Sequence, residues 1–213
     1  MSNIIYRKIS KKDYNYIKNM MNRNFYLYEY IEDKRILEPF LNSYLYNCLA
    51  EKTFSMVAEK DGETVGVILG NTKKDYKTYK AIFNIIKYYY YVLLVFIKSK
   101  IYKTDIKQYK GITQIYDELM KKANKNFDGV LTLFVVSENC QGYGIGKNLL
   151  SYFFEYEKQN NSKNIYVYTD SKCNYKFYDS QGFNKINEDI FKVKTNNSQF
   201  DLNIFLYEYN FFN

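Results

Sequence analysis

The stretch "LTLFVVSENCQGYGIGKNLL", residues 131–150, joins an apolar run to a helical pattern through a loop with glycine at every second position. The run "LTLFVV" predicts a β-strand that is buried on both faces. Apolar residues then recur at helical spacing from Ile145 to Tyr156, which predicts a helix directly after the loop. Three of the nine glycines in the chain therefore lie between a strand and the first turn of a helix: Gly142, Gly144 and Gly146.

Glycines at this place suit the binding of an anion. Amides in the first turn of a helix have no intrahelical partners, and the helix dipole adds partial positive charge there. Side chains at the three positions would block a phosphate, so we expect the stripped loop to wrap an anion with its amides. A Walker loop is excluded because Asn148 follows Lys147, and a dinucleotide fingerprint is excluded because Lys147 replaces the required small residue.

Composition narrows the class of protein. The chain has 213 residues, 46% of them hydrophobic, which is enough for one domain with a real core. The net charge is +8, but arginine is scarce and no dense basic block occurs, so we expect a solvated lysine surface and no nucleic-acid partner. The absence of histidine excludes Ser-His and Cys-His nucleophilic catalysis. Three distant cysteines give no zinc spacing and predict no metal.

The other patterns predict a mixed α/β chain. A reducing cytoplasm is the expected location, because the N-terminal residues lack the apolar core of a signal peptide. The clearest hairpin is "FSMVAEKDGETVGVILGN", which turns at Asp61-Gly62. The remaining elements are expected as strands at 4–9, 164–170, "FNKI" and "LNIFLYEY", and as helices at 11–22, on either side of Pro39 within 24–52, and at 173–182.

Two motifs together carry a resemblance to a known family. "QGYGIG" resembles motif A of the GNAT superfamily of N-acetyltransferases, (Arg/Gln)-x-x-Gly-x-(Gly/Ala), and "FYDSQGF", residues 177–183, resembles motif B one helix and one strand later. The resemblance covers residues 1–72 loosely and 128–210 well. It implies an α+β fold with a mixed, mostly antiparallel sheet flanked by helices. We therefore expect a single domain over 1–213, with a helical insertion at about 72–128 between the third and fourth strands.

The resemblance also implies the cosubstrate, acetyl-CoA, whose pyrophosphate motif A grips in the family. The strand before the loop is expected to splay from its neighbour and to leave backbone groups free for the cofactor arm. Many members carry Asn seven residues before the motif B tyrosine, where this chain has Ser171. The cofactor-binding residues implied are Phe134, Val135, Val136, Gln141, Gly142, Tyr143, Gly144, Ile145, Gly146, Lys147 and Asn174.

The implied reaction moves an acetyl group from the thioester to a primary amine of a small molecule or peptide, by direct attack. By resemblance, Tyr178 is the catalytic residue that protonates the leaving thiolate, and a phenol with a pKa of about 10 carries its proton at neutral pH. Cys140 is read as structural. The alternative is a non-catalytic sensor that binds acyl-CoA with the same loop. The general base is left open between a water chain and the carboxylates Asp128, Glu29, Glu32, Asp33 and Glu38.

The most apolar run of the chain is "AIFNIIKYYYYVLLVFIK", residues 81–98. Asn84 and Lys87 interrupt it, and it is short and polar for a membrane span, which needs about 20 predominantly apolar residues. We expect a helix that packs on the domain and shapes the acceptor side, as a lid or as the face of a homodimer. Flanking lysines keep membrane-surface binding as a lesser alternative. The stripe expected to pack is Ile82, Ile85, Ile86, Tyr89, Leu93 and Phe96.

Overall fold

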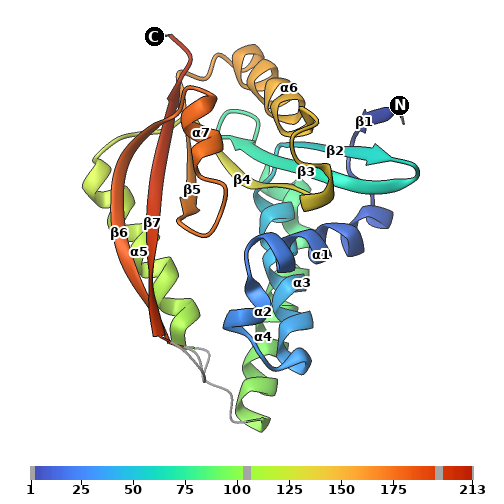
Figure 1. Ribbon diagram of the computed structural model, residues 1–213, viewed down its shortest axis with the longest axis vertical. Helices are drawn as coiled ribbons and strands as arrows, with labels where there is room; N and C mark the ends of the chain where they lie inside the picture. The colour runs from blue at the N-terminus through green and yellow to red at the C-terminus, as the bar shows by residue number, and fades with distance from the viewer. Residues whose placement is uncertain (1–2, 103–106, 195–198, 213) are drawn as a thin grey trace.

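The computed structural model describes residues 3–102, 107–194 and 199–212, and residues 103–106 of the expected insertion lie outside this range. In the described residues, seven strands form one sheet in the order β1-β2-β3-β4-β5-β7-β6, with helices on both faces (Figure 1). The strands are β1 Ile4–Arg7, β2 Phe54–Lys60, β3 Glu63–Thr72, β4 Gly129–Val136, β5 Asn164–Asp170, β6 Asn184–Lys194 and β7 Gln199–Asn210. The helices are α1 Tyr14–Asn24, α2 Leu27–Tyr30, α3 Lys34–Glu51, α4 Thr78–Ile101, α5 Lys107–Ala123, α6 Ile145–Gln159 and α7 Lys176–Ser180, with 3-10 turns η1 Lys11–Asp13 and η2 Glu138–Cys140.

The expected mixed, mostly antiparallel sheet is confirmed. Every neighbouring pair of strands is antiparallel except β4 and β5, which are parallel and joined through α6. The expected hairpin is also present, and Asp61 and Gly62 both have positive φ, at 52° and 85°, as a two-residue turn of this kind requires. The sequence therefore predicted the β-α-β unit that carries the glycine loop, together with its antiparallel neighbours.

The parallel pair divides the sheet into two halves. In the described chain, β4 pairs with β5 at Gly129 and Val130 alone, opposite Ile165 and Tyr166, and the two strands then diverge (Figure 1). A bulge in β4 lies just after the last paired residue, because consecutive residues of β3 pair with Leu131 and with Leu133. A bulge bends the strand that carries it. The bend turns β4 away from β5 and opens a wedge between the two halves.

Three clusters of buried side chains fill the space between the sheet and its helices. One lies between the sheet and α6 and α7, and includes Phe153. The second packs α1 and α3 on the opposite face of β2, β3 and β4, around Leu45 and Val67. The third packs α5 on β6 and β7, around Leu119 and Val193. The wedge therefore opens between two separately packed halves of one domain.

Pro39 lies inside α3, so the break expected near it is wrong. A proline in a helix removes the amide that would bind the carbonyl four residues earlier, here that of Arg35. Lys98 of α4 donates to that carbonyl instead, with Nζ 3.1 Å from the oxygen. A distant side chain thus satisfies the carbonyl that Pro39 leaves without its helical partner.

The region between β3 and β4 is helical, as expected, but its two helices differ. α5 lies against β6 and β7, where it covers the third core cluster. α4 lies along α3 and buries few side chains, among them Ala81 and Val95. By length and composition α4 is long enough and apolar enough to cross a membrane, with 11% of its most apolar window buried, although one such helix is weak evidence. The helix extends beyond the run that the sequence analysis judged too short for a span.

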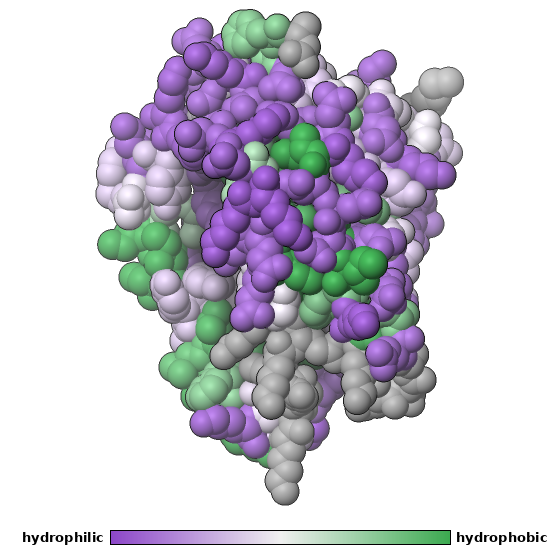
Figure 2. Space-filling model, turned by 90° about the vertical axis from the view of Figure 1, so that its left-hand side faces the viewer, coloured by the Kyte–Doolittle hydropathy of each residue, from purple (hydrophilic) through white to green (hydrophobic). Residues whose placement is uncertain are grey.

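The apolar stripe expected to pack on the domain faces outward, which corrects that interpretation. Five of its six members, Ile82, Ile86, Tyr89, Leu93 and Phe96, are between 49% and 64% exposed, and the sixth, Ile85, is half-buried. By contrast, the face of the molecule that presents β6 and α5 is mostly hydrophilic (Figure 2). Exposed apolar side chains in such number are therefore a feature of α4 and not of the whole protein surface.

A buried carboxyl lies at the base of the wedge. Glu157 of α6 is fully buried, its Oε2 accepts a hydrogen bond from Ser162, and Oε1 has no hydrogen-bond partner in the described part of the chain. A side chain at Gly129 would come within 2.9 Å of both carboxylate oxygens. Burial raises the pKa of Glu157 to about 7, because the charged form is poorly solvated there.

This pKa predicts that stability falls as the pH rises. The folded-state pKa lies above the ordinary value of 4.5, so the protonated form contributes stability. This contribution is fully present below about pH 4.5 and is lost as the pH rises through about 7. We expect Glu157→Gln to remove up to about 3 kcal/mol of this loss between pH 5 and pH 8. Urea unfolding at a series of pH values measures it. Glu155→Gln, at an exposed position of the same helix, is the matched control and should leave the pH dependence unchanged; equal profiles for both variants would contradict the assignment.

Candidate active site

The glycine loop leads from η2 into α6 at the open end of β4. Gly142 and Gly144 have φ values of +83° and +76°, in the left-handed region that side chains disfavour. Gly144 is the N-cap of α6, and no side chain caps the helix. A Cβ atom added at either glycine would meet no other atom within 4 Å. The loop therefore presents uncapped amides to open space.

The charges around these amides also favour an anion. No acidic residue occurs in the first turn of α6, and Lys147 of that turn is exposed. The Nζ atom of Lys60 lies 5.8 Å from the ring centroid of Tyr143, which is 71% exposed. A helix N-terminus with free amides and nearby lysines is a site for phosphate. The geometry thus fits the pyrophosphate that the sequence implied.

The remaining loop residues have different surroundings. Ile145 is 1% exposed in the core, so only its backbone faces the loop. Gly146 is half-buried, and a Cβ atom added there would lie 3.4 Å from the rings of Phe134 and Phe177, so a side chain at this glycine would point at those rings and not into the open loop. Gln141 is exposed, and its Nε2 atom lies 3.4 Å from Oδ1 of Asn24 at the end of α1. This contact links the glycine loop to the N-terminal helices across the mouth of the wedge.

The end of β4 lines one side of the wedge. Val135 packs against α1 and α3, whereas Phe134 and Val136 face the α6 and α7 side. Because β4 has left β5 before this point, the edge of β4 toward β5 carries no strand pairing at these three residues. Free backbone groups at such an edge can bind an extended ligand by strand-like hydrogen bonds. The splay that the resemblance implied is present.

Tyr178 of α7 packs against the end of β4. Its side chain is 8% exposed, and its ring centroid lies 6.4 Å from that of Phe134 and 5.8 Å from that of Tyr207. Burial raises the pKa of the phenol well above 10, with smaller contributions from Cys173 and Asp170. The hydroxyl therefore stays protonated at neutral pH and can donate a hydrogen bond.

Asp170, at the end of β5, is a candidate that the sequence analysis missed. Its Oδ1 accepts hydrogen bonds from the backbone amides of Lys172 and Cys173, and its Oδ2 lies 3.4 Å from the Cys173 thiol. Burial raises its pKa above the ordinary value of 3.8, against those hydrogen bonds. Its charge acts on tyrosines from four helices, of which Tyr178 is buried and the others are half-buried: Tyr30, Tyr44, Tyr116 and Tyr178. It is the last residue of a predicted strand, but nothing in the sequence indicates that these helices would enclose it.

The base candidates named from the sequence lie elsewhere or are paired. Asp128 precedes β4 at the end opposite the glycine loop, about 25 Å away along the strand at ~3.3 Å per residue. Asp33 caps α3 and binds the Arg35 guanidinium, and Glu38 binds Lys18 with 2.5 Å between Oε1 and Nζ. Glu32, between α2 and α3, is exposed.

Glu29 is the candidate of that group that reaches the loop after β5. It forms an ion pair with Lys172, whose ammonium also lies 4.1 Å from the ring centroid of Phe200. This pair bridges α2 to the segment that carries Asp170. Glu29 is therefore close to the open end of β5, but its carboxylate is already paired.

The segment before motif B departs from the family pattern in a way the structure explains. Ser171 stands where many members have Asn, and its amide donates to the Asn203 carbonyl while its hydroxyl accepts from the Asn203 amide. Both groups therefore hold β7 beside the loop. Asn174 is exposed, and its carbonyl accepts from the amide of Phe177. Its side chain is the one of the two that is available for a cofactor contact.

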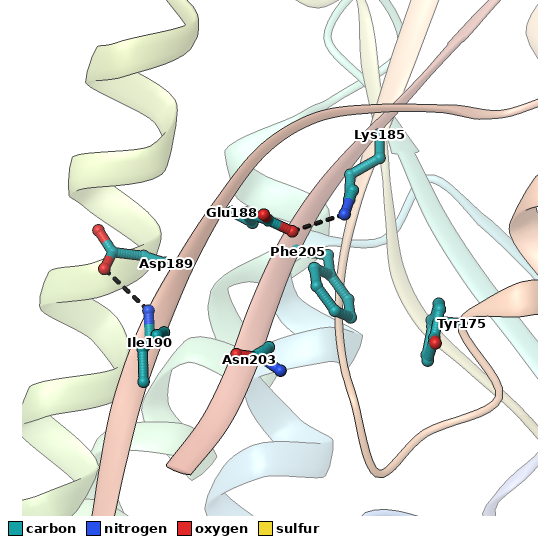
Figure 3. A pocket seen from close by; sticks show the side chains of 7 residues that line it. All are labelled: Tyr175, Lys185, Glu188, Asp189, Ile190, Asn203 and Phe205. Carbon is teal, nitrogen blue, oxygen red and sulfur yellow. Dashed lines mark hydrogen bonds and ion pairs between the residues drawn. The ribbon is translucent and has the colours of Figure 1, made fainter.

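A shallow hollow on the outer side of β6 and β7 does not include the glycine loop. Its volume is about 540 Å³, and it includes Tyr175 and Phe205 beside the exposed pair Lys185–Glu188 (Figure 3). An exposed ion pair contributes little to stability or binding. This hollow shares no lining residue with the wedge, so we place the site at the wedge.

Comparison with known proteins decides the family. The family model described as "Acetyltransferase (GNAT) family" matches residues 15–183. The chain belongs to the GNAT family of acetyltransferases. Family members use acetyl-CoA, and the two motifs that carried the resemblance lie within the matched range. No curated protein matches this GNAT chain in sequence.

Solved structures share the whole fold at low identity. Arylalkylamine N-acetyltransferase 2 from Aedes aegypti is 16% identical with a TM-score of 0.61, over 98% of this chain and 99% of that one. PH1933 from Pyrococcus horikoshii OT3 is 17% identical with a TM-score of 0.60, over 98% of both chains. PaiA N-acetyltransferase from Thermoplasma acidophilum, in complex with coenzyme A, is 14% identical with a TM-score of 0.54, over 98% and 99%. At these identities they show that this chain has the GNAT fold.

The glycine loop gives a direct test. We expect Gly144→Val to lower coenzyme A affinity more than tenfold, because a branched side chain would enter the open space beside the uncapped amides. Strain at positive φ also costs about 1–2 kcal/mol. Gly62→Val is the matched control, since Gly62 has φ +85° and equally open surroundings but lies in the β2–β3 turn. Calorimetric titration with coenzyme A measures both; equal affinities for the two folded variants would rule out the loop as the binding site.

Proposed function

We propose that the protein is an N-acetyltransferase that transfers an acetyl group from acetyl-CoA to a primary amine by direct attack. The observation that carries the proposal is the uncapped glycine loop of α6 beside the splayed end of β4, with Tyr178 and Asp170 at the same wedge. The amides of the loop would hold the pyrophosphate, with Asn174 and Lys147 at its border. The backbone of Phe134, Val135 and Val136 would hold the arm that carries the thioester.

The chemistry assigned to the side chains is proton transfer. As the amine nitrogen bonds to the carbonyl carbon, negative charge develops on the oxygen, and an amide at the free edge of β4 can donate to it. Asp170 would accept the proton that the nitrogen loses. The bond from carbon to sulfur then breaks, and Tyr178 would donate its proton to the departing sulfur. Net, one proton leaves the amine and one is gained by the thiolate, so the acid and base return to their initial states through solvent.

Cysteine is not needed in this scheme. Burial and the neighbouring Asp170 raise the pKa of the Cys173 thiol well above its usual range, so the reactive thiolate is suppressed. Cys140, beside the loop, is buried. Both features support direct transfer over an acyl-cysteine intermediate. The proposal also includes a cytoplasmic location and a reaction that uses no metal.

Tyr178→Phe tests the proton donor. We expect kcat to fall about a hundredfold, the lower end of the range for general acid catalysis, because the raised pKa of the phenol makes full transfer to a thiolate uphill. Coenzyme A affinity should change less than twofold, since the ring remains packed against Phe134. Tyr207→Phe, which removes a hydroxyl from the neighbouring buried ring, is the control. Steady-state kinetics on an accepted amine measure both, and a wild-type kcat for Tyr178→Phe would exclude it as the acid.

The same assay separates the enzyme from the sensor alternative. Thioester hydrolysis and amine acetylation are followed across polyamines, arylalkylamines, aminoglycosides and peptide N-termini. A wild-type protein that binds coenzyme A but acetylates none of these amines would replace the enzyme with an acyl-CoA-binding module.

Asp170→Asn tests the base through the pH profile. The carboxylate must be charged to accept a proton, so wild-type kcat should fall as the pH drops through the raised pKa of Asp170. The Asn variant should lose about 10²-fold in kcat and should lack this acidic limb. Glu29→Gln is the control, because Glu29 is the neighbouring carboxylate and is already paired with Lys172. If the limb persists in Asp170→Asn and disappears in Glu29→Gln, the base is Glu29.

A further inference from the structure

We propose that the outward face of α4 binds the surface of an anionic lipid bilayer, with the helix lying in the plane of the interface. Eleven large apolar side chains of this helix are at least 38% exposed, and they recur along its whole length. A contiguous patch of this many exposed apolar side chains is typical of a binding surface. The members of this surface, named here the α4 face, are Tyr79, Ile82, Phe83, Ile86, Tyr89, Tyr90, Val92, Leu93, Phe96, Ile97 and Ile101.

Charge decides which occupant fits the α4 face. The helix has four lysines and no acidic residue, and Lys77 directly precedes it. Lys80 and Lys87 are seven residues apart, about two helical turns, so they lie in one row beside the apolar face, and Lys100 is exposed near the end of the helix. The ammonium of Lys98 is bound to the Arg35 carbonyl of α3. Such a helix is attracted to anionic lipid headgroups. In a symmetric dimer through this face, neither copy of α4 would offer a carboxylate to the lysines of the other.

The carboxylates nearest to α4 do not change this balance. Glu38 and Glu51 belong to α3, and they act on Tyr91 and Tyr88, which are half-buried on the α3 side of the helix. Asp33, the N-cap of α3, is close enough to Lys98 to feel its charge, and it is paired with Arg35. Glu38 is moreover paired with Lys18. The α4 face itself therefore presents apolar and cationic groups. Its exposed tyrosines are residues that concentrate at membrane–water interfaces.

Attachment to α3 favours a helix that lies on the bilayer over one that spans it. Asn84 Nδ2 donates to the Leu49 carbonyl at 3.1 Å, near the start of α4, and Lys98 Nζ donates to the Arg35 carbonyl at 3.1 Å, near its end. If α4 spanned the bilayer, these hydrogen bonds would have to break, or the charged ends of α3 would have to enter the hydrocarbon, which is energetically costly. Lying in the interface leaves the α3 side unchanged and buries the apolar side.

Vesicle binding by the full chain tests the proposal. We expect the protein to co-sediment with vesicles of phosphatidylcholine and phosphatidylserine, and to bind pure phosphatidylcholine vesicles at least tenfold more weakly. Changing Lys80, Lys87 and Lys100 together to Gln should weaken binding to the anionic vesicles about a hundredfold. The matched control changes three exposed lysines elsewhere, Lys158, Lys176 and Lys192, to Gln, and should weaken binding less than threefold.

The apolar part of the face is tested separately. Ile82→Ser, Ile86→Ser and Leu93→Ser together should abolish binding to both kinds of vesicle, and circular dichroism and coenzyme A affinity should match the wild type because all three side chains are exposed. Wild-type protein that ignores both vesicles would overturn the proposal. A dimer in sedimentation equilibrium that the Ser variant breaks would assign the face to a second copy. Vesicle-bound protein that resists alkaline carbonate extraction would instead indicate a spanning helix.

Discussion

The structure depends on a parallel strand pair that is only two residues long on each side. Gly129 and Val130 of β4 meet Ile165 and Tyr166 of β5, and beyond them each half of the sheet follows its own packing. A longer parallel pair would close the wedge. Without any pairing between β4 and β5, the two halves of the sheet would be separate. The bulge after Val130 sets the limit, because it turns the next residues of β4 out of reach of β5.

The base of the wedge is held by polar groups rather than by packing alone. Glu157, Ser162 and Thr72 form a buried chain of contacts at the end where the strands are paired, with 3.2 Å between the Thr72 and Ser162 hydroxyls. This chain joins α6, the turn that follows it, and β3. The same helix α6 begins at the glycine loop, so one rigid element connects the closed end of the wedge to its open end.

The sequence predicted those parts of the site that depend on neighbouring residues. The glycine loop needs positive φ at Gly142 and Gly144, and the alternation of glycines is a local pattern that states this directly. The turn at Asp61-Gly62 and the strand at 164–170 are likewise specified by residues that are neighbours in the sequence. Asp170 could not be found in this way, because its burial results from helices that approach from both sides of it in the sequence. Pro39 within α3 is explained by Lys98, which lies 63 positions from Arg35 along the chain.

The helices α4 and α5 show that the hydrophobicity of a helix does not by itself predict how much of it is buried. α5 alternates apolar with charged residues and places Leu119 in a core, whereas α4 is apolar around most of its circumference and turns Ile86 and Leu93 to solvent. The difference arises from the partners that each helix finds. α5 covers one face of β6 and β7, and α4 lies along α3. Of the apolar side chains of α4, Ala81 and Val95 are buried, while eleven large ones stay exposed. An apolar stripe predicts burial, but whether the burial is within the chain or against something else is decided by the space the fold leaves.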